Sequence, residues 1–126
     1  MRANRSRDTG PELALRSALH RRGLRFRKEV GIRASGAERP IRADIVFPRQ
    51  RIAVFVDGCF WHGCPEHGEL PVANRDYWHA KFQRNVDRDH RNTAALTAAG
   101  WQVVRIWEHT PVGQAVDAVV AALSRR

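Results

Sequence analysis

Helical spacing of apolar residues marks three segments of this 126-residue chain. The first begins at Thr9-Gly10-Pro11-Glu12, where Thr9 and Glu12 fit a capping box and the proline suits the first helical turn. This helix should end at Gly23. A longer helix is expected from about Asn74 to Ala99, because Gly100 then supplies its C-terminal stop. The third segment is an amphipathic helix whose apolar pattern begins at Val112 and runs to the end of the chain.

Shorter apolar runs between these helices predict four β-strands. The run 51–56 (Arg-Ile-Ala-Val-Phe-Val) is apolar at nearly every position, which is typical of a central strand buried on both faces. Residues 34–40 contain glycine and proline and are expected to form a loop. The other strands are expected at 25–30, 42–47 and 101–107. The order α-β-β-β-α-β-α predicts one domain over residues 1–126, in the α/β class, with a mixed sheet flanked by helices.

The net charge of +9 favours a polyanionic partner, and nucleic acid is the commonest one. Lys28 and Lys81 are the only lysines among 22 basic residues, so a genome rich in arginine codons is an alternative source of the charge. No apolar run approaches the roughly 20 residues that a membrane helix needs. No secretory signal is visible after Met1, so we expect a cytoplasmic protein without a membrane partner.

Cysteine and histidine gather between residues 59 and 67. Cys59, Cys64 and His67 are spaced for a chelating loop, and thiolate and imidazole are the ligands that zinc prefers. A fourth ligand must come from elsewhere, and His109 is the candidate if the strands before these two segments are neighbours. The alternative is two buried free cysteines with surface histidines. In an intracellular protein the pattern favours structural zinc over a disulfide.

Acidic residues end up near one another if two predicted strands pair. Asp44 stands among apolar neighbours, where a carboxylate is costly unless it is paired or binds a cation. The next strand leads into Asp57, so both strands deliver oxygen ligands. Magnesium prefers such ligands, and phosphodiester hydrolysis uses it to polarise the phosphoryl group. Each acid also has a structural interpretation: an arginine partner for Asp44, a turn for Asp57 and the capping box for Glu12.

This arrangement resembles the core of restriction-endonuclease-like nucleases, in which an aspartate is followed across a hairpin by Asp/Glu-x-Lys. Phe55-Val56-Asp57 has no lysine, so another group must act as base or electrophile. His62 is the nearest candidate, because an imidazole titrates near neutral pH and can pass a proton in the transition state.

Longer motifs are similar to those of the very short patch repair (Vsr) endonucleases. The most specific is Asp57-Gly58-Cys59-Phe60-Trp61-His62-Gly63-Cys64-Pro65, which contains the run Cys-Phe-Trp-His. The others follow the family's order over nearly the whole chain: Arg7-Asp8-Thr9-Gly10-Pro11-Glu12, Tyr77-Trp78-His79-Ala80-Lys81, Arg84-Asn85-Val86-Asp87-Arg88-Asp89, Gly100-Trp101-Gln102-Val103 and Ile106-Trp107-Glu108.

The resemblance implies a restriction-endonuclease-like fold and a strand-specific nick 5′ to the thymine of a T·G mismatch, the product of 5-methylcytosine deamination. It implies that Asp44 binds Mg²⁺ together with the backbone carbonyl of Val56, and that His62 is the catalytic histidine. Glu12 and Asp57 match positions that hold metal-bound waters or assist the base. The structural zinc positions correspond to Cys59, Cys64, His67 and His109.

The resemblance also implies DNA-contacting residues. Phe60, Trp61 and Trp78 match aromatic side chains that wedge into the DNA stack beside the mismatch, where opening a base step costs least. Lys81 and Asn85 match residues near the mismatched bases, and their spacing places them on one helix face. The alternative for Trp78 is a core stripe with the apolar residues four and eight positions further along the helix.

The chain departs from better-known members of the family at three places. It has Val56-Asp57 where they carry Thr-His, which keeps a backbone ligand but changes the proton relay. It has His109 where the fourth zinc ligand is usually cysteine. The arm before Arg5 is short, which predicts a looser choice of mismatch.

Two other functions use the same features: a zinc-stabilised DNA-binding module that recognises distorted DNA without catalysis, and a restriction-type nuclease that cuts paired duplex. A module that only binds DNA does not need Asp44 and His62, so their presence argues against the first alternative. The missing lysine and the aromatic wedges argue against the second. One nick needs one active site, so a monomer is expected. The resemblance also implies a functional link to a cytosine-5 methyltransferase.

Overall fold

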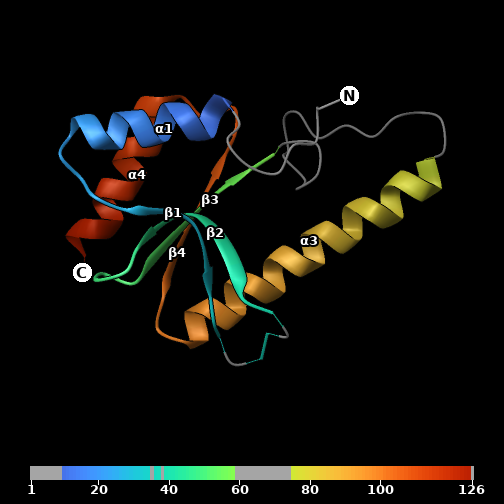
Figure 1. The fold of residues 1–126 in the computed structure, drawn as a ribbon. Coiled ribbons are helices and arrows are strands. Elements are labelled where there is room, and N and C mark those ends of the chain that lie inside the picture. The colour runs from blue at the N-terminus through green and yellow to red at the C-terminus, as the bar shows by residue number, and fades with distance from the viewer. Residues whose placement is uncertain (1–9, 35, 38, 59–74, 126) are drawn as a thin grey trace.

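The computed structural model describes residues 10–34, 36–37, 39–58 and 75–125. Its helices and strands follow the predicted order: α1 (Gly10–Arg21), β1 (Arg27–Ile32), β2 (Ile41–Phe47), β3 (Ile52–Asp57), α3 (Arg75–Ala98), β4 (Gln102–Trp107) and α4 (Val112–Ser124). The elements form three layers, with α1 and α4 on one face of the sheet and α3 on the other (Figure 1). Among the described helices, none has both the length and the apolar character that crossing a membrane requires.

The sheet is mixed, as predicted, with strand order β1-β2-β3-β4. The pairs β1–β2 and β2–β3 are antiparallel, whereas β3–β4 is parallel with Val56 opposite Ile106. The continuous apolar run of β3 does form an inner strand, and its residues alternate between the two faces. Because β3 and β4 run in the same direction, Asp57 and Trp107 are neighbours at the same edge of the sheet.

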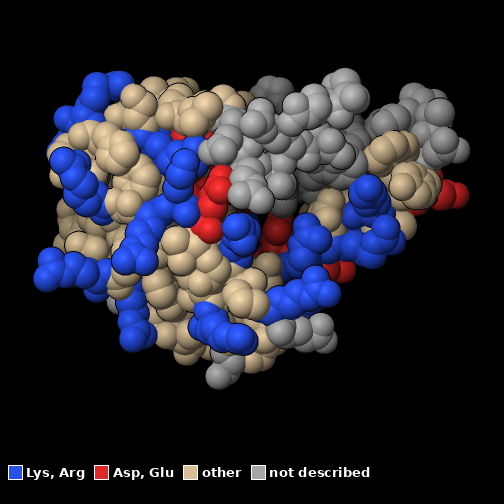
Figure 2. Space-filling model, in the orientation of Figure 1, with Lys and Arg blue, Asp and Glu red and all other residues tan. Residues whose placement is uncertain are grey.

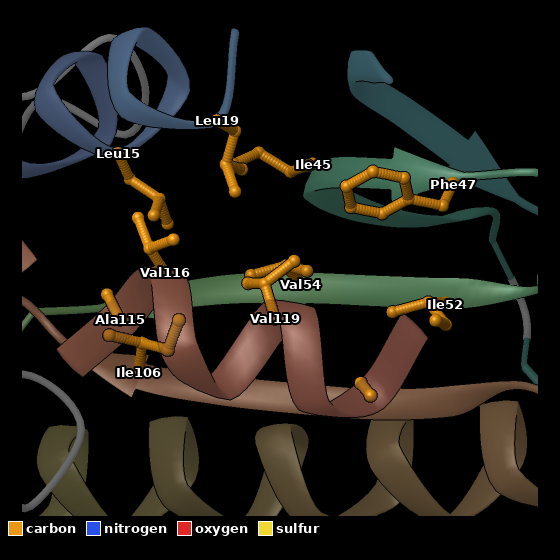
Figure 3. Close-up of a cluster of buried hydrophobic side chains, with 11 residues drawn as sticks. Leu15, Leu19, Ile45, Phe47, Ile52, Val54, Ile106, Ala115, Val116 and Val119 are labelled. Carbon is orange, nitrogen blue, oxygen red and sulfur yellow. The ribbon is translucent and has the colours of Figure 1, made fainter. Parts of the chain in front are cut away.

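Two hydrophobic clusters fill the spaces between the layers. The α1/α4 cluster joins one face of the sheet to both helices (Figure 3), and the α3 cluster lies on the opposite face. Buried members of the first are Leu15, Leu19, Ile45, Phe47, Ile52, Val54, Ile106, Ala115, Val116, Val119 and Ala122. Those of the second are Ile32, Ile41, Ala43, Val46, Ala53, Phe55 and Leu96.

Glycines end α1 and α3, as the sequence predicted. Gly23 and Gly100 have φ values of 82° and 91°, in the left-handed region where glycine avoids a Cβ clash. In each turn an amide beyond the glycine reaches back to a helix carbonyl, from Leu24 to Leu19 and from Trp101 to Leu96. The first strand begins two residues later than predicted, because Phe26 packs against the α1/α4 cluster before pairing with β2 begins at Arg27.

The β1–β2 pair is distorted at one position, where Glu29 faces Asp44 in the register. Glu29 has a φ of 55°, which is uncommon for a residue with a side chain. The faces of β2 exchange here: Ala43 belongs to the α3 cluster, yet Ile45 belongs to the α1/α4 cluster. Regular alternation would put both on one face. This irregularity turns the Asp44 side chain toward the neighbouring strand.

Candidate active site

The carboxylate of Asp44 takes the place of a backbone group between β2 and β3. Backbone pairing of these strands extends from Phe47–Ile52 to Ile45–Val54. Beyond it, the amide of Val56 donates to Oδ2 of Asp44 at 2.7 Å. A short bond from an amide to a carboxylate holds the side chain in one orientation. Asp44 is thus fixed at the point where the two strands separate.

The environment of Asp44 makes its negative charge costly. The pKa of Asp44 is raised from its ordinary value of 3.8 to about 7, and burial is the largest of several causes. The amide of Val56 acts in the opposite direction, while the carboxyl group of Glu12 raises the pKa further by its charge and by a hydrogen bond. The charge of Asp57 adds a smaller effect in the same direction. A cation placed beside these groups would relieve the repulsion.

Glu12 comes to this site from the first turn of α1. Its side chain is buried, with 3% of the residue exposed, and its Oε1 lies 3.8 Å from Nη1 of Arg16 one turn later. Its carboxyl group acts on Asp44 by its charge and by a hydrogen bond. The structure therefore brings Glu12 beside Asp44, while Thr9, the other residue of the capping box, lies outside the described residues.

Asp57 is held by an arginine that sequence reasoning missed. Nη1 of Arg105 on β4 donates to both carboxylate oxygens of Asp57, at 2.9 and 3.2 Å. The same guanidinium donates to the hydroxyl of Thr93 and the carbonyl of Asp89 on α3, and lies 4.3 Å above the centre of the Phe55 ring. Arg105 thus joins β3, β4 and α3 at the edge of the site.

A cleft of about 540 Å³ opens over these residues. Its walls come from β1, β2, β3, β4 and α3, and they mix acids with arginines. The lining residues are Glu29, Arg42, Asp44, Phe55, Val56, Asp57, Arg88, Asp89, Asn92 and Arg105. Figure 2 shows red Asp and Glu side chains near the centre of the view with blue Lys and Arg side chains beside them. Acids to hold a cation and arginines to hold phosphates are what a phosphodiester substrate requires.

The donor set fits a magnesium ion better than a fully protein-enclosed metal. Within the described residues, no three acidic, histidine or cysteine side chains lie close enough to enclose an ion by themselves. Magnesium keeps several waters and needs only one or two carboxylates. Asp44, whose pKa is raised first by burial and then by neighbouring carboxyl groups, and the backbone of Val56 are the groups that the resemblance implied for this role.

The three predicted DNA contacts on α3 lie in the N-terminal half of that helix. Trp78, Lys81 and Asn85 are all half-buried, and Trp78 packs edge-on against Tyr77 at 5.1 Å between ring centres. In the described part of the chain, neither hydrophobic cluster includes Trp78. Both interpretations of Trp78, a DNA contact and a core stripe, stay predictions.

Six predicted site residues lie outside the described residues, and they stay predictions: Cys59, Phe60, Trp61, His62, Cys64 and His67. His109 is described and follows β4 directly, while residue 59 follows β3. Because β3 and β4 are parallel neighbours, both segments leave the same edge of the sheet. This satisfies the condition that the sequence set for His109 as the fourth zinc ligand.

Residues 1–67 match the protein family described as DNA mismatch endonuclease Vsr. The chain is 50% identical to the type II nicking enzyme V.NaeI of Lentzea aerocolonigenes, over 98% of this chain and 74% of that protein. It is 46% identical to the type II nicking enzyme V.XorIIP of Xanthomonas oryzae pv. oryzae, over 86% and 76% of the two chains. It is 37% identical to the DNA mismatch endonuclease Vsr of Escherichia coli K12, over 86% and 66%. The resemblance seen in the motifs is thereby confirmed, and the chain belongs to the Vsr family of DNA endonucleases.

Proposed function

We propose that this protein nicks one strand of duplex DNA 5′ to the thymine of a T·G mismatch, in a Mg²⁺-dependent hydrolysis. One observation carries the proposal. The carboxylate of Asp44 is fixed by the amide of Val56 and has an environment that raises its pKa to about 7, in a cleft whose other walls carry arginines. A carboxylic acid whose pKa is shifted this far by its surroundings is typical of a functional site.

Each part of the cleft has a chemical task in this proposal. Asp44 and the carbonyl of Val56 would hold Mg²⁺, which supplies polarisation of the phosphate when bound. Arg105 keeps the carboxylate of Asp57 in place at the edge of the same cleft. His62, which lies outside the described residues, is the group proposed to transfer the proton. The action of the relatives on DNA supports the substrate class, and mismatch choice is the finer part of the proposal.

A nicking assay tests this function. Wild-type protein and Asp44→Asn are incubated with Mg²⁺ and four labelled duplexes: T·G, the fully paired T·A and C·G controls, and a second mismatch such as A·C. We expect a nick in the thymine strand of T·G, with paired duplexes intact. The variant should lose at least about 100-fold in rate, because a bound metal provides several kcal/mol of transition-state stabilisation. Cleavage of paired duplex at an equal rate would indicate a restriction-type nuclease instead.

The magnesium site has a test that does not depend on cleavage. At pH 7, millimolar Mg²⁺ should raise the melting temperature of the wild type, because an ion that binds only the folded state stabilises it. Asp44→Asn should show little or no such shift. An equal Mg²⁺ shift in both proteins would place the ion elsewhere. The same samples can be titrated with Ca²⁺ to separate binding from catalysis.

A further inference from the structure

A second hollow adjoins the cleft over Asp44 on the side away from α1. It has a volume of about 650 Å³ and lies between α3 and the segment from residue 36 to β2. We call it the arginine groove. Its lining residues are Gly36, Ala37, Arg39, Pro40, Ile41, Arg42, Arg88, Arg91, Asn92 and Ala95.

The described lining of the groove is rich in positive charge. Among the lining residues that the structure describes, four are arginines and none is Asp or Glu. All four arginines are exposed, and Arg88 donates to Asn85 on its own helix. Four like charges around one hollow repel each other unless an anion lies between them.

The groove and the cleft form one continuous surface. Arg42, Arg88 and Asn92 line both hollows, so a ligand that leaves the cleft on this side enters the groove directly. The positions of Arg88, Arg91 and Asn92 fall on one face of α3, three and four residues apart. Figure 2 shows blue side chains continuing past the red area along this side of the molecule.

We propose that the arginine groove binds the sugar–phosphate backbone of the nicked strand beside the cut. This inference rests on the proposed nicking activity, because it takes the scissile phosphate to lie over Asp44. A guanidinium matches the geometry of a phosphate through two parallel N–H···O bonds, and an asparagine side chain adds a neutral donor. Contacts of this kind fix the register of the enzyme on the duplex without reading a base.

The continuity of the two hollows indicates which DNA strand would lie in the arginine groove. A backbone that passes over Asp44 and on between Arg42 and Arg88 is one covalent chain, so the phosphates in the groove belong to the strand that is cut. Contacts on one side of the cut would also keep that end of the nicked strand bound. An acidic protein partner is the competing occupant, and the experiment below separates the two.

The test uses a pair of arginines that line the groove alone. Arg39→Ala/Arg91→Ala removes two charges and leaves the cleft residues intact. The matched control, Arg22→Ala/Arg125→Ala, removes two exposed arginines at the ends of α1 and α4, on the other side of the sheet. Both variants have the same net charge, so long-range attraction to DNA falls equally. Melting temperatures confirm that each protein is folded.

Binding to a T·G duplex is measured without added divalent metal, between 50 and 200 mM salt. Each phosphate contact contributes about 0.9 to the slope of log affinity against log salt, so the groove variant should lose about 2 from this slope. We expect roughly 5- to 50-fold weaker binding at low salt for the groove variant. The control should stay within about twofold of the wild type. Equal behaviour of the two variants would overturn the proposal and leave the groove to another partner.

A second arm locates the contacts. Single uncharged methylphosphonates replace, one at a time, the three phosphates on either side of the cut in each strand. In the wild type, a methylphosphonate at one or two positions on one side of the cut should weaken binding. At those positions the same methylphosphonates should leave the affinity of the groove variant unchanged. A response confined to the complementary strand would refute the strand assignment. If the wild type binds as described but never nicks, the proposed nicking function is refuted, while the binding of DNA phosphates by the arginine groove is supported.

Discussion

Arg105 holds Asp57 by both carboxylate oxygens, at 2.9 and 3.2 Å, across two parallel strands that meet at the edge of the active-site cleft. Its other donors reach α3, so one guanidinium sets the position of the acid and of the helix that carries the proposed DNA contacts. In this chain the nuclease motif has aspartate where a lysine is usual. The cation near that position comes instead from the neighbouring strand, and we treat Arg105 as a positioning residue.

Replacing Arg105 by methionine should weaken both stability and catalysis. The apolar stem is kept, but Asp57 loses a charged partner in a partly buried place, which costs about 1 to 3 kcal/mol of unfolding free energy. We expect kcat to fall at least about tenfold with KM changed less, since Arg105 acts through Asp57. Urea unfolding and steady-state nicking measure the two effects, with Arg125→Met as the exposed control.

A double-mutant cycle shows whether the pair acts together. If the interaction matters, Asp57→Asn and Arg105→Met should be non-additive by at least about 1 kcal/mol in stability. Purely additive losses would mean that Arg105 only fills space between β4 and α3.

Asp44→Asn should stabilise the protein at neutral pH while it abolishes nicking. The folded-state pKa of Asp44, about 7, lies above its ordinary 3.8, so the folded state binds the proton more tightly than the unfolded state. The wild type therefore loses stability as the pH rises from about 4 to about 7, and this loss is complete above that range. Asparagine carries no charge and still accepts the amide of Val56.

The expected gain is about 1 to 3 kcal/mol at pH 7.5, and it should shrink toward zero near pH 4. Thermal melts of both proteins from pH 4 to 8, without added divalent metal, give the difference. Using the difference cancels other titrations that the two proteins share. A gain that is the same at every pH would show that the charge of Asp44 is not its source.

The parts of the fold that depend on local pattern were predictable from the sequence. The apolar run 51–56 identified the inner strand, and Gly23 and Gly100 placed the ends of two helices to within two residues. Asp44 and Asp57 were expected to be close because consecutive strands commonly pair. The structure agrees on each of these points. Glu12, which only the resemblance had assigned to the site, is linked to Asp44 by a hydrogen bond.

Arg105 and the arginine groove were not predictable in the same way. The only local signal for Arg105 was a charge within the apolar strand Val103-Val104-Arg105-Ile106. Its partner is set by the parallel register of β3 and β4, in which Phe55 faces Arg105, and that register depends on the whole sheet. Likewise, Arg39 and Arg91 lie more than 50 positions apart and meet only because α3 packs beside β2.

The zinc site remains a prediction that metal analysis can test. Purified protein should contain one zinc per chain, and Cys64→Ser should contain almost none. Chelation should lower the melting temperature of the wild type, since a structural zinc contributes directly to folding stability. His109→Ala should bind zinc more weakly if it supplies the fourth ligand, because a closed site needs four. Full zinc occupancy in His109→Ala would assign that position to another residue.

Trp78→Ala distinguishes the two interpretations of that side chain. If Trp78 wedges into DNA, its loss should cost less than about 1.5 kcal/mol of stability, because no described core cluster includes it. A core tryptophan would cost about 3 to 5 kcal/mol instead. Nicking of T·G duplex should fall at least tenfold, since the energy of opening the base step is no longer offset. The control is Tyr77→Ala, which removes the exposed neighbouring ring. If the two variants lose stability and activity alike, the aromatic pair supports the helix end and Trp78 has no separate role in the DNA.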